Sequence, residues 1–395
     1  MSTRNGTRWQ GREVVIVEAA RTPIGRGHQA RGWFRDVHPN ELLGAAYRAV
    51  IERAGIDAEL VEDVVAGAVS QVGEQSNNIA RNAWLQAGLR VTTPATTVDR
   101  QCGSGQQAVS FAAGLIAAGV HDVMIGAGVE HMGRVPMGSN VAHADEFGTP
   151  FPPELMERYE LVPQGISAEM IATRWEIPRS EQDALGLRSH QLAARATDEG
   201  RFEREIIPFE ADGELRTTDQ GIRRDTSLEA LAALKPAFKE DGSVTAGNSS
   251  QISDGAAAVL LMAREKADEL GLAPRARIFD ATTAGVDPVI MLTGPIPATR
   301  TLLERNGMTI SDLDLIEINE AFASVVCAWR RELEPDMDRV NVNGGALALG
   351  HPLGSSGARL LTTLLHELER SDGEVGLVTM CTAGGTGTGT LIQRV

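Results

Sequence analysis

The amino-acid sequence contains an internal repeat whose two copies lie 252 positions apart. The matching pairs are 51–65 with 303–317, Ser104-Gly105 with Ser356-Gly357, and 122–128 with 374–380. Identity within any one pair is low, but a single offset holds across all three. Because self-similarity at a fixed spacing reports architecture directly, we interpret the chain as a duplication.

Local patterns inside the repeat predict α/β layers. The apolar runs VVIVEA (14–19) and DVMIGAG (122–128) are typical of buried strands, and 41–54 carries apolar residues on one helical face before Gly55. Such alternation favours layers built on mostly parallel sheets. The predicted fold class is therefore α/β, with two related α/β/α halves.

The stretch between the repeats differs in character and predicts an insertion. It combines a Pro-rich loop, GTPFPPELMERYELVP, with a charged helical segment and polar connections. We expect it to fold over the first half, where loops on such scaffolds commonly carry binding function. The predicted division is 1–128 for the first half, 129–246 for an inserted loop domain, 247–275 for a return to the first half, and 276–395 for the second half.

The charge balance excludes some partners. The chain has 37 Lys and Arg against 53 Asp and Glu, a net charge of −16. This balance opposes binding to nucleic acid or to an anionic membrane surface, although a few local arginines are enough for a small anion. No uncharged apolar run approaches the roughly 20 residues that span a bilayer, and the N-terminus carries no apolar targeting stretch. A cytoplasmic protein is expected, with a very short mitochondrial transit peptide as the alternative.

Three cysteines do not form a disulfide framework, so each thiol needs its own explanation. Cys102 precedes a helix of small residues, where backbone N–H groups and the helix dipole favour the thiolate and lower the thiol pKa. Gly103 and Gly105 permit a close approach of substrate to the backbone. The residues alone leave two readings equally open for Cys102, a nucleophile and a buried core cysteine.

The other candidate groups are weaker when taken singly. His351 lies in a stiff Gly-His-Pro segment and suits either a base or a structural hydrogen bond. Cys381 ends a predicted strand before a glycine run, but no Gly-Lys-Ser/Thr follows, which argues against a nucleotide loop. Cys327 lies on an apolar helix surface and is interpreted as packing. No spacing of metal ligands occurs, so no metal is expected.

Taken together, four motifs in order resemble the thiolase family, and the resemblance covers essentially the whole chain. The motifs are CGSGQQA at 102–108, NEAFA at 319–323, GGALALGHPLGSSGAR at 344–359, and Cys381 with the glycines that follow it. The resemblance implies cleavage of 3-oxoacyl-CoA with coenzyme A as co-substrate, no permanently bound cofactor, and a homodimer or homotetramer. It also implies that the insertion covers the active site.

The resemblance assigns roles residue by residue. Cys102 matches the acyl-accepting nucleophile, His351 the group that activates it, Cys381 the second cysteine that shuttles protons, and Asn319 the residue that holds a catalytic water. Ala383 stands where the family usually has glycine, and it would supply an oxyanion N–H only under strain if that position required a positive φ.

The resemblance also suggests how coenzyme A is held. Arg223 matches a contact to the adenine nucleotide, and Ser250 a contact to the pantetheine arm. Several segments, among them GEQSNNIAR (73–81), are similar to bacterial thiolases of steroid breakdown. A degradative thiolase of fatty-acid or steroid β-oxidation is therefore expected. The alternatives are an acetoacetyl-CoA-forming thiolase and a non-catalytic acyl-CoA-binding protein.

Overall fold

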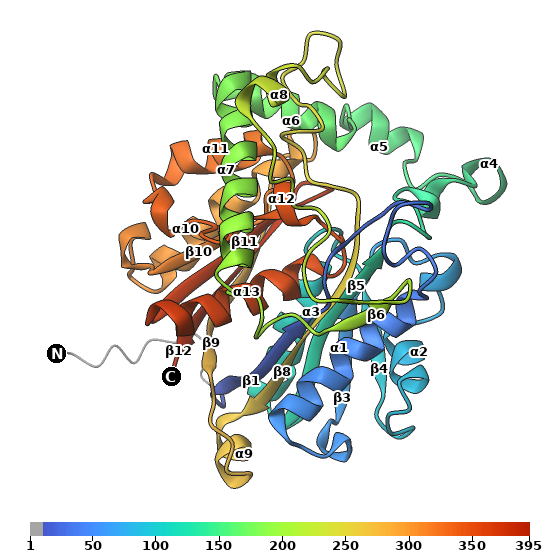
Figure 1. Cartoon of the computed structure of the whole chain (residues 1–395), viewed down its shortest axis with the longest axis vertical. Helices are drawn as coiled ribbons and strands as arrows, with labels where there is room; N and C mark the ends of the chain where they lie inside the picture. The colour runs from blue at the N-terminus through green and yellow to red at the C-terminus, as the bar shows by residue number, and fades with distance from the viewer. Residues whose placement is uncertain (1–10) are drawn as a thin grey trace.

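A computed structural model describes residues 11–395, and its helices and strands repeat with the offset found in the sequence (Figure 1). Strand β3 (Asp63–Gly67) corresponds to β10 (Leu315–Ile318), helix α3 (Ser104–Ala117) to α13 (Ser356–Ser371), and strand β5 (Val123–His131) to β11 (Val375–Thr382). In each pair the first residues differ by 252. The predicted duplication is confirmed.

The remaining elements complete the two halves and the connection between them. In the first half these are β1 (Val14–Arg21), β2 (Gly25–Arg26), α1 (Pro39–Ala54), α2 (Ile79–Gln86), β4 (Ala95–Val98), β8 (Ser253–Ala263) and α9 (Arg264–Glu269). In the second they are β9 (Ala276–Gly285), α10 (Pro295–Arg305), α11 (Ala323–Leu333), α12 (Ala346–Leu349) and β12 (Thr386–Arg394). Between β5 and β8 lie α4 (Ala144–Phe147), α5 (Pro153–Arg158), α6 (Gln164–Arg174), α7 (Arg179–Asp198), β6 (Phe209–Ala211), β7 (Glu214–Arg216) and α8 (Leu228–Ala232).

The strands form one long sheet in the order β10-β11-β12-β9-β1-β8-β5-β3-β4, with β2 beside β8. The two halves join through a short antiparallel pairing of β1 with β9, in which Val15 faces Arg277 and Ile16 faces Ala276. Among the strands described, only the pairs β3/β4, β3/β5 and β10/β11 are parallel. The prediction of mostly parallel sheets was wrong, because β11 and β12 are joined by a tight turn, which forces antiparallel pairing.

The insertion occupies the corresponding turn of the first half. β5 pairs with β8 antiparallel as β11 pairs with β12, but residues 132–252 separate β5 from β8. Helices α6 and α7 of this insertion pack on α11 in the second half, whereas Phe209 of β6 packs on Phe34 of the first. The insertion therefore contacts the first half, over which it was expected to fold, and the second half as well. The predicted domain limits at 128, 246 and 275 stay a prediction.

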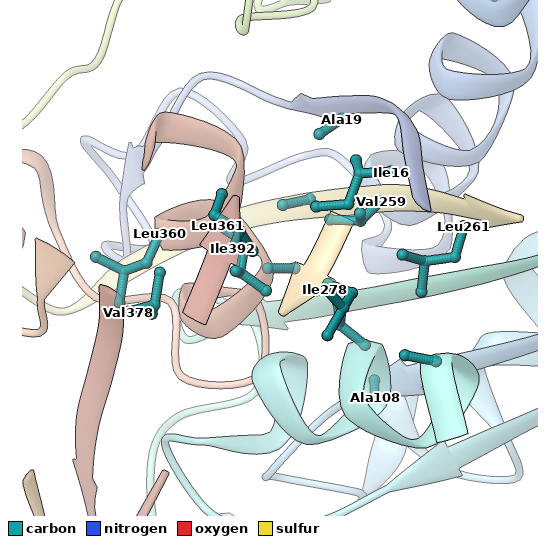
Figure 2. Close-up of a cluster of buried hydrophobic side chains, with 14 of the residues drawn as sticks. Ile16, Ala19, Ala108, Val259, Leu261, Ile278, Leu360, Leu361, Val378 and Ile392 are labelled. Atoms are coloured by element: carbon teal, nitrogen blue, oxygen red, sulfur yellow. The ribbon is translucent and has the colours of Figure 1, made fainter. Parts of the chain in front are cut away.

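Three apolar clusters separate the layers. One lies between the halves, where α3 and α13 bring Ala108 and Leu360 against Val259, Val378 and other residues of both sheet halves (Figure 2). The second packs α1 and α2 on the outer face of the first half, and the third packs α10 and α11 on the second. Helices α3 and α13 thus form a central layer between the two sheet halves, although Phe111 on α3 stays exposed.

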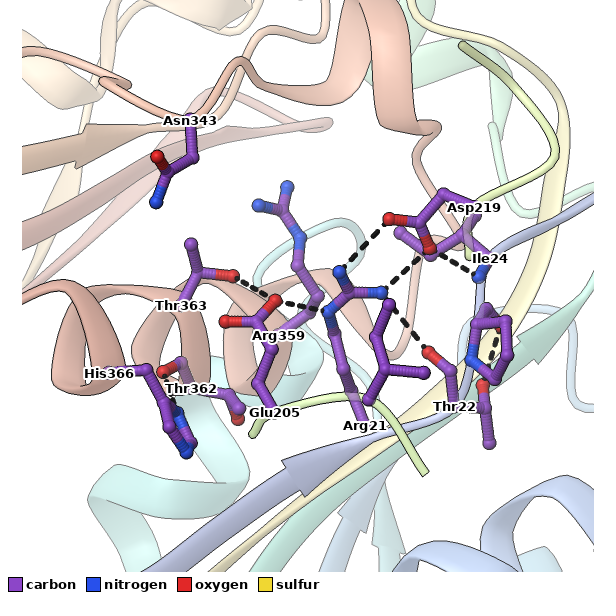
Figure 3. A network of polar contacts seen from close by, with 12 residues as sticks. Arg21, Thr22, Ile24, Glu205, Asp219, Asn343, Arg359, Thr362, Thr363 and His366 are labelled. Carbon is purple, nitrogen blue, oxygen red and sulfur yellow. Dashed lines mark hydrogen bonds and ion pairs between the residues drawn. The ribbon is translucent and has the colours of Figure 1, made fainter. Parts of the chain in front are cut away.

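A buried ion network ties the insertion to β1 (Figure 3). Arg21 is fully buried and donates from Nε to Glu205 at 2.6 Å and from both terminal nitrogens to Asp219 at 2.7 and 3.0 Å. Asp219 also accepts from the backbone N–H of Ile24 at 2.8 Å. Because Glu205 and Asp219 belong to the insertion, these contacts fix its polar loops over the end of β1.

No helix in residues 11–395 is long and apolar enough to cross a membrane. Residues 1–10, on which part of the expectation about targeting depends, lie outside the described residues.

Removing one anion from the buried network is expected to destabilise the protein strongly. Asp219→Ala leaves Arg21 with a single buried carboxylate, which costs about 3–5 kcal/mol of unfolding free energy. Asp198→Ala, which breaks an exposed pair with Arg224, serves as the matched control and leaves stability near that of the wild type. Equilibrium urea unfolding measures both, and equal effects of the two substitutions would contradict the network's role.

Candidate active site

Two cysteines from different halves lie together at the N-terminal end of α3. Cys102 is 3% exposed. Cys381, the penultimate residue of β11, is fully buried. The backbone after Cys102 touches the end of β11, since a Cβ added at Gly103 would lie 2.8 Å from Cγ2 of Thr382. Glycine at 103 is required by this close approach rather than by its dihedral angles.

Burial dominates the acidity of Cys102. It raises the thiol pKa to about 12, although hydrogen bonds from the backbone N–H groups of Ala383 and of Cys102 itself act in the opposite direction. The sequence-based expectation of a lowered pKa was wrong, because removal of water outweighs the favourable helix end. The structure nevertheless aims the N–H of Ala383 at the Cys102 sulfur.

The second thiol is coupled to the first. Burial raises the pKa of Cys381 above its usual range, and the nearby charge of an ionised Cys102 raises it further. Both thiols are therefore protonated in the resting protein, and ionisation of one opposes ionisation of the other. Cys327 is buried in the apolar cluster of α10 and α11, as predicted for a packing residue.

His351 is held as a neutral base. Its Nδ1 lies 2.6 Å from Oγ of Ser356, and that hydroxyl donates to the carbonyl of Pro352 at 2.8 Å. Oγ must therefore accept from Nδ1–H, which leaves the lone pair on Nε2. Burial, helped by the Arg359 guanidinium, lowers the His351 pKa to about 3. The ring is consequently uncharged at neutral pH.

Asn319 contacts the same imidazole nitrogen. Its amide Nδ2 lies 3.3 Å from Nε2 of His351, and its backbone N–H donates to Thr379 in β11. The side chain is fully buried, and its Oδ1 accepts no hydrogen bond from residues 11–395. An unpaired amide oxygen beside a base is a suitable place for an ordered water.

Glu130 holds the histidine loop in place, and sequence reasoning missed it. This fully buried carboxylate ends β5 and accepts from the backbone N–H groups of Val69, Ser70 and Gly354 at 2.9–3.0 Å. Gly354 follows His351 by three positions, so Glu130 links the histidine loop to the first half. The available signal was a charged residue at the end of an otherwise apolar run.

Ala383 occupies its turn without strain. The turn between β11 and β12 places its two left-handed residues at Gly384 (φ 77°) and Gly385 (φ 74°), and Ala383 is not among the positive-φ residues. The strain expected for alanine at this position does not arise. Ala383 can therefore donate its N–H toward Cys102 as glycine would.

The two predicted coenzyme A contacts lie in different surroundings. Arg223 lines a surface pocket of about 420 Å³ on the insertion with Arg195, Arg224 and His190, and its N–H donates to His190 at 3.0 Å. Ser250 is half-buried, and its N–H donates to Ala321, two residues after Asn319. Contacts thus join Cys102 with Cys381 and Ala383, and join His351 with Asn319, whose backbone N–H donates to β11, while Arg223 lies in the surface pocket of the insertion. Among residues 11–395, no group of three or more potential metal ligands occurs.

The resting state of Cys102 gives a testable pH dependence. Because its thiol pKa is about 12, alkylation by iodoacetamide should accelerate about tenfold per pH unit from roughly pH 6 to 9. No inflection is expected near 6.5, the ordinary histidine pKa, since His351 stays neutral. Mass spectrometry of the Cys102 peptide measures the rate. A plateau below pH 8 would show a preformed thiolate instead.

The chain matches family models over nearly all of its length. Residues 14–265 match the model described as "Thiolase, N-terminal domain", and residues 272–394 match "Thiolase, C-terminal domain". A steroid 3-ketoacyl-CoA thiolase of Mycobacterium tuberculosis is 45% identical, with 100% of this chain and 97% of the relative covered. An acetyl-CoA acetyltransferase of Syntrophomonas wolfei is 44% identical, with 97% of this chain and 100% of the relative covered.

A solved structure agrees with these matches. The crystal structure of the acetyl-CoA acetyltransferase of Bacillus anthracis has a TM-score of 0.90 and 39% identity, and the match covers 98% of this chain and 99% of that one. With two family models spanning both halves and relatives matched end to end, this chain belongs to the thiolase family.

Proposed function

We propose that this thiolase cleaves 3-oxoacyl-CoA with coenzyme A to give acetyl-CoA, or propionyl-CoA, and a shortened acyl-CoA. The observation that carries the proposal is the pair of neighbouring buried thiols from different halves with a backbone N–H donor beside Cys102, and a buried, neutral histidine ahead of α13, whose N-terminal end meets that of α3. Two thiols of matched acidity suit the exchange of one thioester for another.

The first step forms an acyl-enzyme. The Cys102 thiol gives its proton to Nε2 of His351, and the thiolate attacks the 3-keto carbon. Negative charge then develops on the former carbonyl oxygen, where backbone N–H groups such as those of Cys102 and Ala383 stabilise it. Burial makes the resting thiol neutral, so ionisation is tied to the arrival of substrate.

The second step breaks the C2–C3 bond. Its electron pair stays on C2, giving the enolate of acetyl-CoA, and the acyl group remains on Cys102. The enolate oxygen is placed against His351 and the water that Asn319 holds, while the Cys381 thiol protonates C2. Acetyl-CoA leaves, and Cys381 is now a thiolate.

The third step returns both cysteines to their starting state. The Cys381 thiolate takes the proton from the thiol of incoming coenzyme A, whose sulfur attacks the acyl-Cys102 thioester. Cys102 leaves as a thiolate and recovers its proton from His351. Every proton and bond is thus accounted for without a metal or redox cofactor being consumed.

Coenzyme A is a polyanion, and the chain as a whole is acidic. Arg195, Arg223 and Arg224 bring positive charge to the pocket on α7 and the loop before α8, where they outnumber the carboxylates Asp198 and Glu199. Guanidinium groups can stack on adenine and contact phosphate. We propose this pocket for the nucleotide end of coenzyme A and Ser250 for the pantetheine arm.

The preferred direction is degradation, in fatty-acid or steroid side-chain β-oxidation. The 45% identity to a steroid 3-ketoacyl-CoA thiolase supports this assignment. The 44% identity to an acetyl-CoA acetyltransferase keeps an acetoacetyl-CoA-forming enzyme as the second candidate. We also propose a cytoplasmic location, since three free thiols suit a reducing compartment.

Substitution of each thiol separates its role. Cys102→Ser should lower thiolysis by about 10⁴-fold or more and abolish the acyl-enzyme, and Cys381→Ser should lower thiolysis by about 10²–10⁴-fold. Cys327→Ser, in the apolar cluster, is the control and keeps turnover. Loss of the 3-oxo thioester absorbance is followed with acetoacetyl-CoA, a long-chain 3-oxoacyl-CoA and a steroid-derived one, each with free coenzyme A.

The substrate series also decides between the candidate functions. Preference for acetoacetyl-CoA would favour the biosynthetic enzyme. Cleavage of none of the three, with coenzyme A binding retained, would favour a non-catalytic carrier. Turnover by Cys102→Ser at the wild-type rate would contradict the proposed mechanism.

We further propose a homo-oligomer built on the edge of the sheet. β4 is the last strand in the order, so its outer edge pairs with no strand of residues 11–395. Unpaired strand edges are templates for pairing with another chain. Light scattering should give twice or four times the monomer mass of 42.1 kDa. Thr96→Lys in β4 should shift the protein toward the monomer, and a wild-type monomer would contradict the proposal.

A further inference from the structure

A buried glutamine bridges the two halves beside the thiols. Gln106 lies in the first turn of α3, is 1% exposed, and uses its whole side-chain amide on the second half. Its Nε2 donates to the carbonyl of Val378 at 3.1 Å and to Oγ1 of Thr390 at 2.8 Å. Its Oε1 accepts from the hydroxyl of Thr388 at 2.6 Å.

These contacts reach the backbone that carries each cysteine. Gln106 follows Cys102 by four residues on the same short segment, and Val378 precedes Cys381 by three on β11. Thr388 lies opposite Met380 in the β11/β12 ladder, next to the pair of Cys381 with Gly387. The glutamine therefore joins the start of α3 to the hairpin that presents both Cys381 and the N–H of Ala383.

The duplication supplies an internal comparison. The position that corresponds to Gln106 in the second half is Ala358, since the two differ by 252. In the ladders, Met380–Thr388 corresponds to Gly128–Ala257 and Val378–Thr390 to Gly126–Val259. The counterparts of the two threonines are thus Ala257 and Val259. Ala358, Ala257 and Val259 all belong to the apolar cluster in which α13 packs on β8.

The same helix-to-sheet contact is therefore apolar in one half and polar in the other. The packing itself does not require a glutamine, because its duplicate is made by alanine and valine. Beside these two helix-to-sheet contacts, the N-terminal ends of α3 and α13 touch each other. A Cβ added at Gly357 would lie 2.1 Å from the backbone nitrogen of Gln106. The polar version occurs on the side where the two thiols must be held in register.

We propose that Gln106, with Thr388 and Thr390, is a positioning clamp that sets the geometry of Cys102 relative to Cys381 and Ala383. This inference rests on the proposed thiolase reaction. Directional hydrogen bonds fix the register of α3 along β11 and β12, whereas apolar contacts permit small sliding. Gln106 does not touch the reacting atoms and acts only through the placement of the two cysteine segments.

A shape-conserving variant tests the clamp. Gln106→Met, Thr388→Val and Thr390→Val together remove all three polar side chains at once. The carbonyl of Val378 loses the glutamine donor but stays within β11, which is paired with β10 and β12, so the fold should survive. Gln107→Met is the matched control, because the neighbouring Gln107 lines a surface groove with Ser110 and Gly114 and its Oε1 has no partner in residues 11–395.

The expected result is a split between rate and binding. In the triple variant kcat for thiolysis should fall by about 10²-fold, the effect of a displacement near 1 Å between reacting groups. The KM for coenzyme A and the unfolding temperature should stay near those of the wild type, since the clamp contacts neither the proposed coenzyme A pocket nor an unsatisfied group. The control should match the wild type in all three.

A second readout does not depend on activity. Dibromobimane becomes fluorescent when it links two neighbouring thiols, so its reaction with Cys102 and Cys381 reports their mutual placement directly. Linking should slow in the triple variant and not in Gln107→Met, with Cys327→Ser as the background in every case. A wild-type protein that links its thiols but cleaves no 3-oxoacyl-CoA would overturn the proposed function and leave the clamp testable.

Two outcomes would overturn the clamp. One is a triple variant with wild-type kcat and linking rate. The other is a lower kcat that falls in step with the folded fraction while linking in the folded protein is unchanged, which is what a structural role alone predicts. If the triple variant does not fold, Gln106→Glu replaces it, because this substitution keeps the side-chain shape but removes the donors to Val378 and Thr390. The clamp then requires that Gln106→Glu lowers kcat while the KM for coenzyme A stays near that of the wild type.

Discussion

The approach of the N-terminal ends of α3 and α13 is the contact on which the active site depends. A Cβ added at Gly105 would lie 2.7 Å from the carbonyl of Gly354, and one at Gly357 would lie 2.1 Å from the nitrogen of Gln106. Only glycine permits two helix ends to meet this closely in the centre of a protein. The contact brings together the segment ahead of α3, which carries Cys102, and the segment ahead of α13, which carries His351. The residues at Cys102 and Gly103 also touch the end of β11.

Burial at this contact determines the chemistry of the resting protein. It raises the pKa values of Cys102 and Cys381 and lowers that of His351, so all three groups are neutral. Charge separation is unfavourable until a substrate oxygen can accept hydrogen bonds from the backbone and share the negative charge. Arg359 contributes to the neutrality of His351. Its buried guanidinium (Figure 3) has no hydrogen-bond partner within residues 11–395. Its Nη1 lies 3.8 Å from Oε2 of Glu317.

The second half and the first half use the same scaffold for different purposes. In the second half, β11 and β12 are joined by a tight glycine turn that contains Ala383. In the first half, the corresponding strands β5 and β8 are separated by the insertion. The insertion is tied down by buried polar contacts of Glu205 and Asp219 with Arg21 and by apolar packing of α6 and α7 on α11. One hairpin thus directs a backbone N–H at Cys102, and the insertion in its duplicate carries the surface on which Arg223 lies.

Much of this could be read from the sequence, because periodicity and repetition are local or additive properties. The 252-residue offset, the strand at β1, the helix ended by Gly55, and the packing role of Cys327 are all visible in short windows. The motifs also named Cys102, His351, Cys381 and Asn319, of which the structure places Cys102 beside Cys381 and His351 beside Asn319. The residues around Cys102 did not decide whether it is a nucleophile or a core residue. A short window of sequence does not show which other segments surround a side chain.

Only the tertiary structure decided the properties that depend on distant segments. The lowered pKa expected for Cys102 was reversed, because desolvation is set by every layer around the thiol and not by the adjacent helix end. The roles of Glu130 and Gln106 emerged only when their partners, up to 284 positions away, were in place. Strand direction in the sheet was likewise decided by which strands became neighbours. The sequence by itself determined the duplicated elements and the identity of the reactive groups, whereas folding decided their protonation and mutual placement, because both arise from contacts between the two halves.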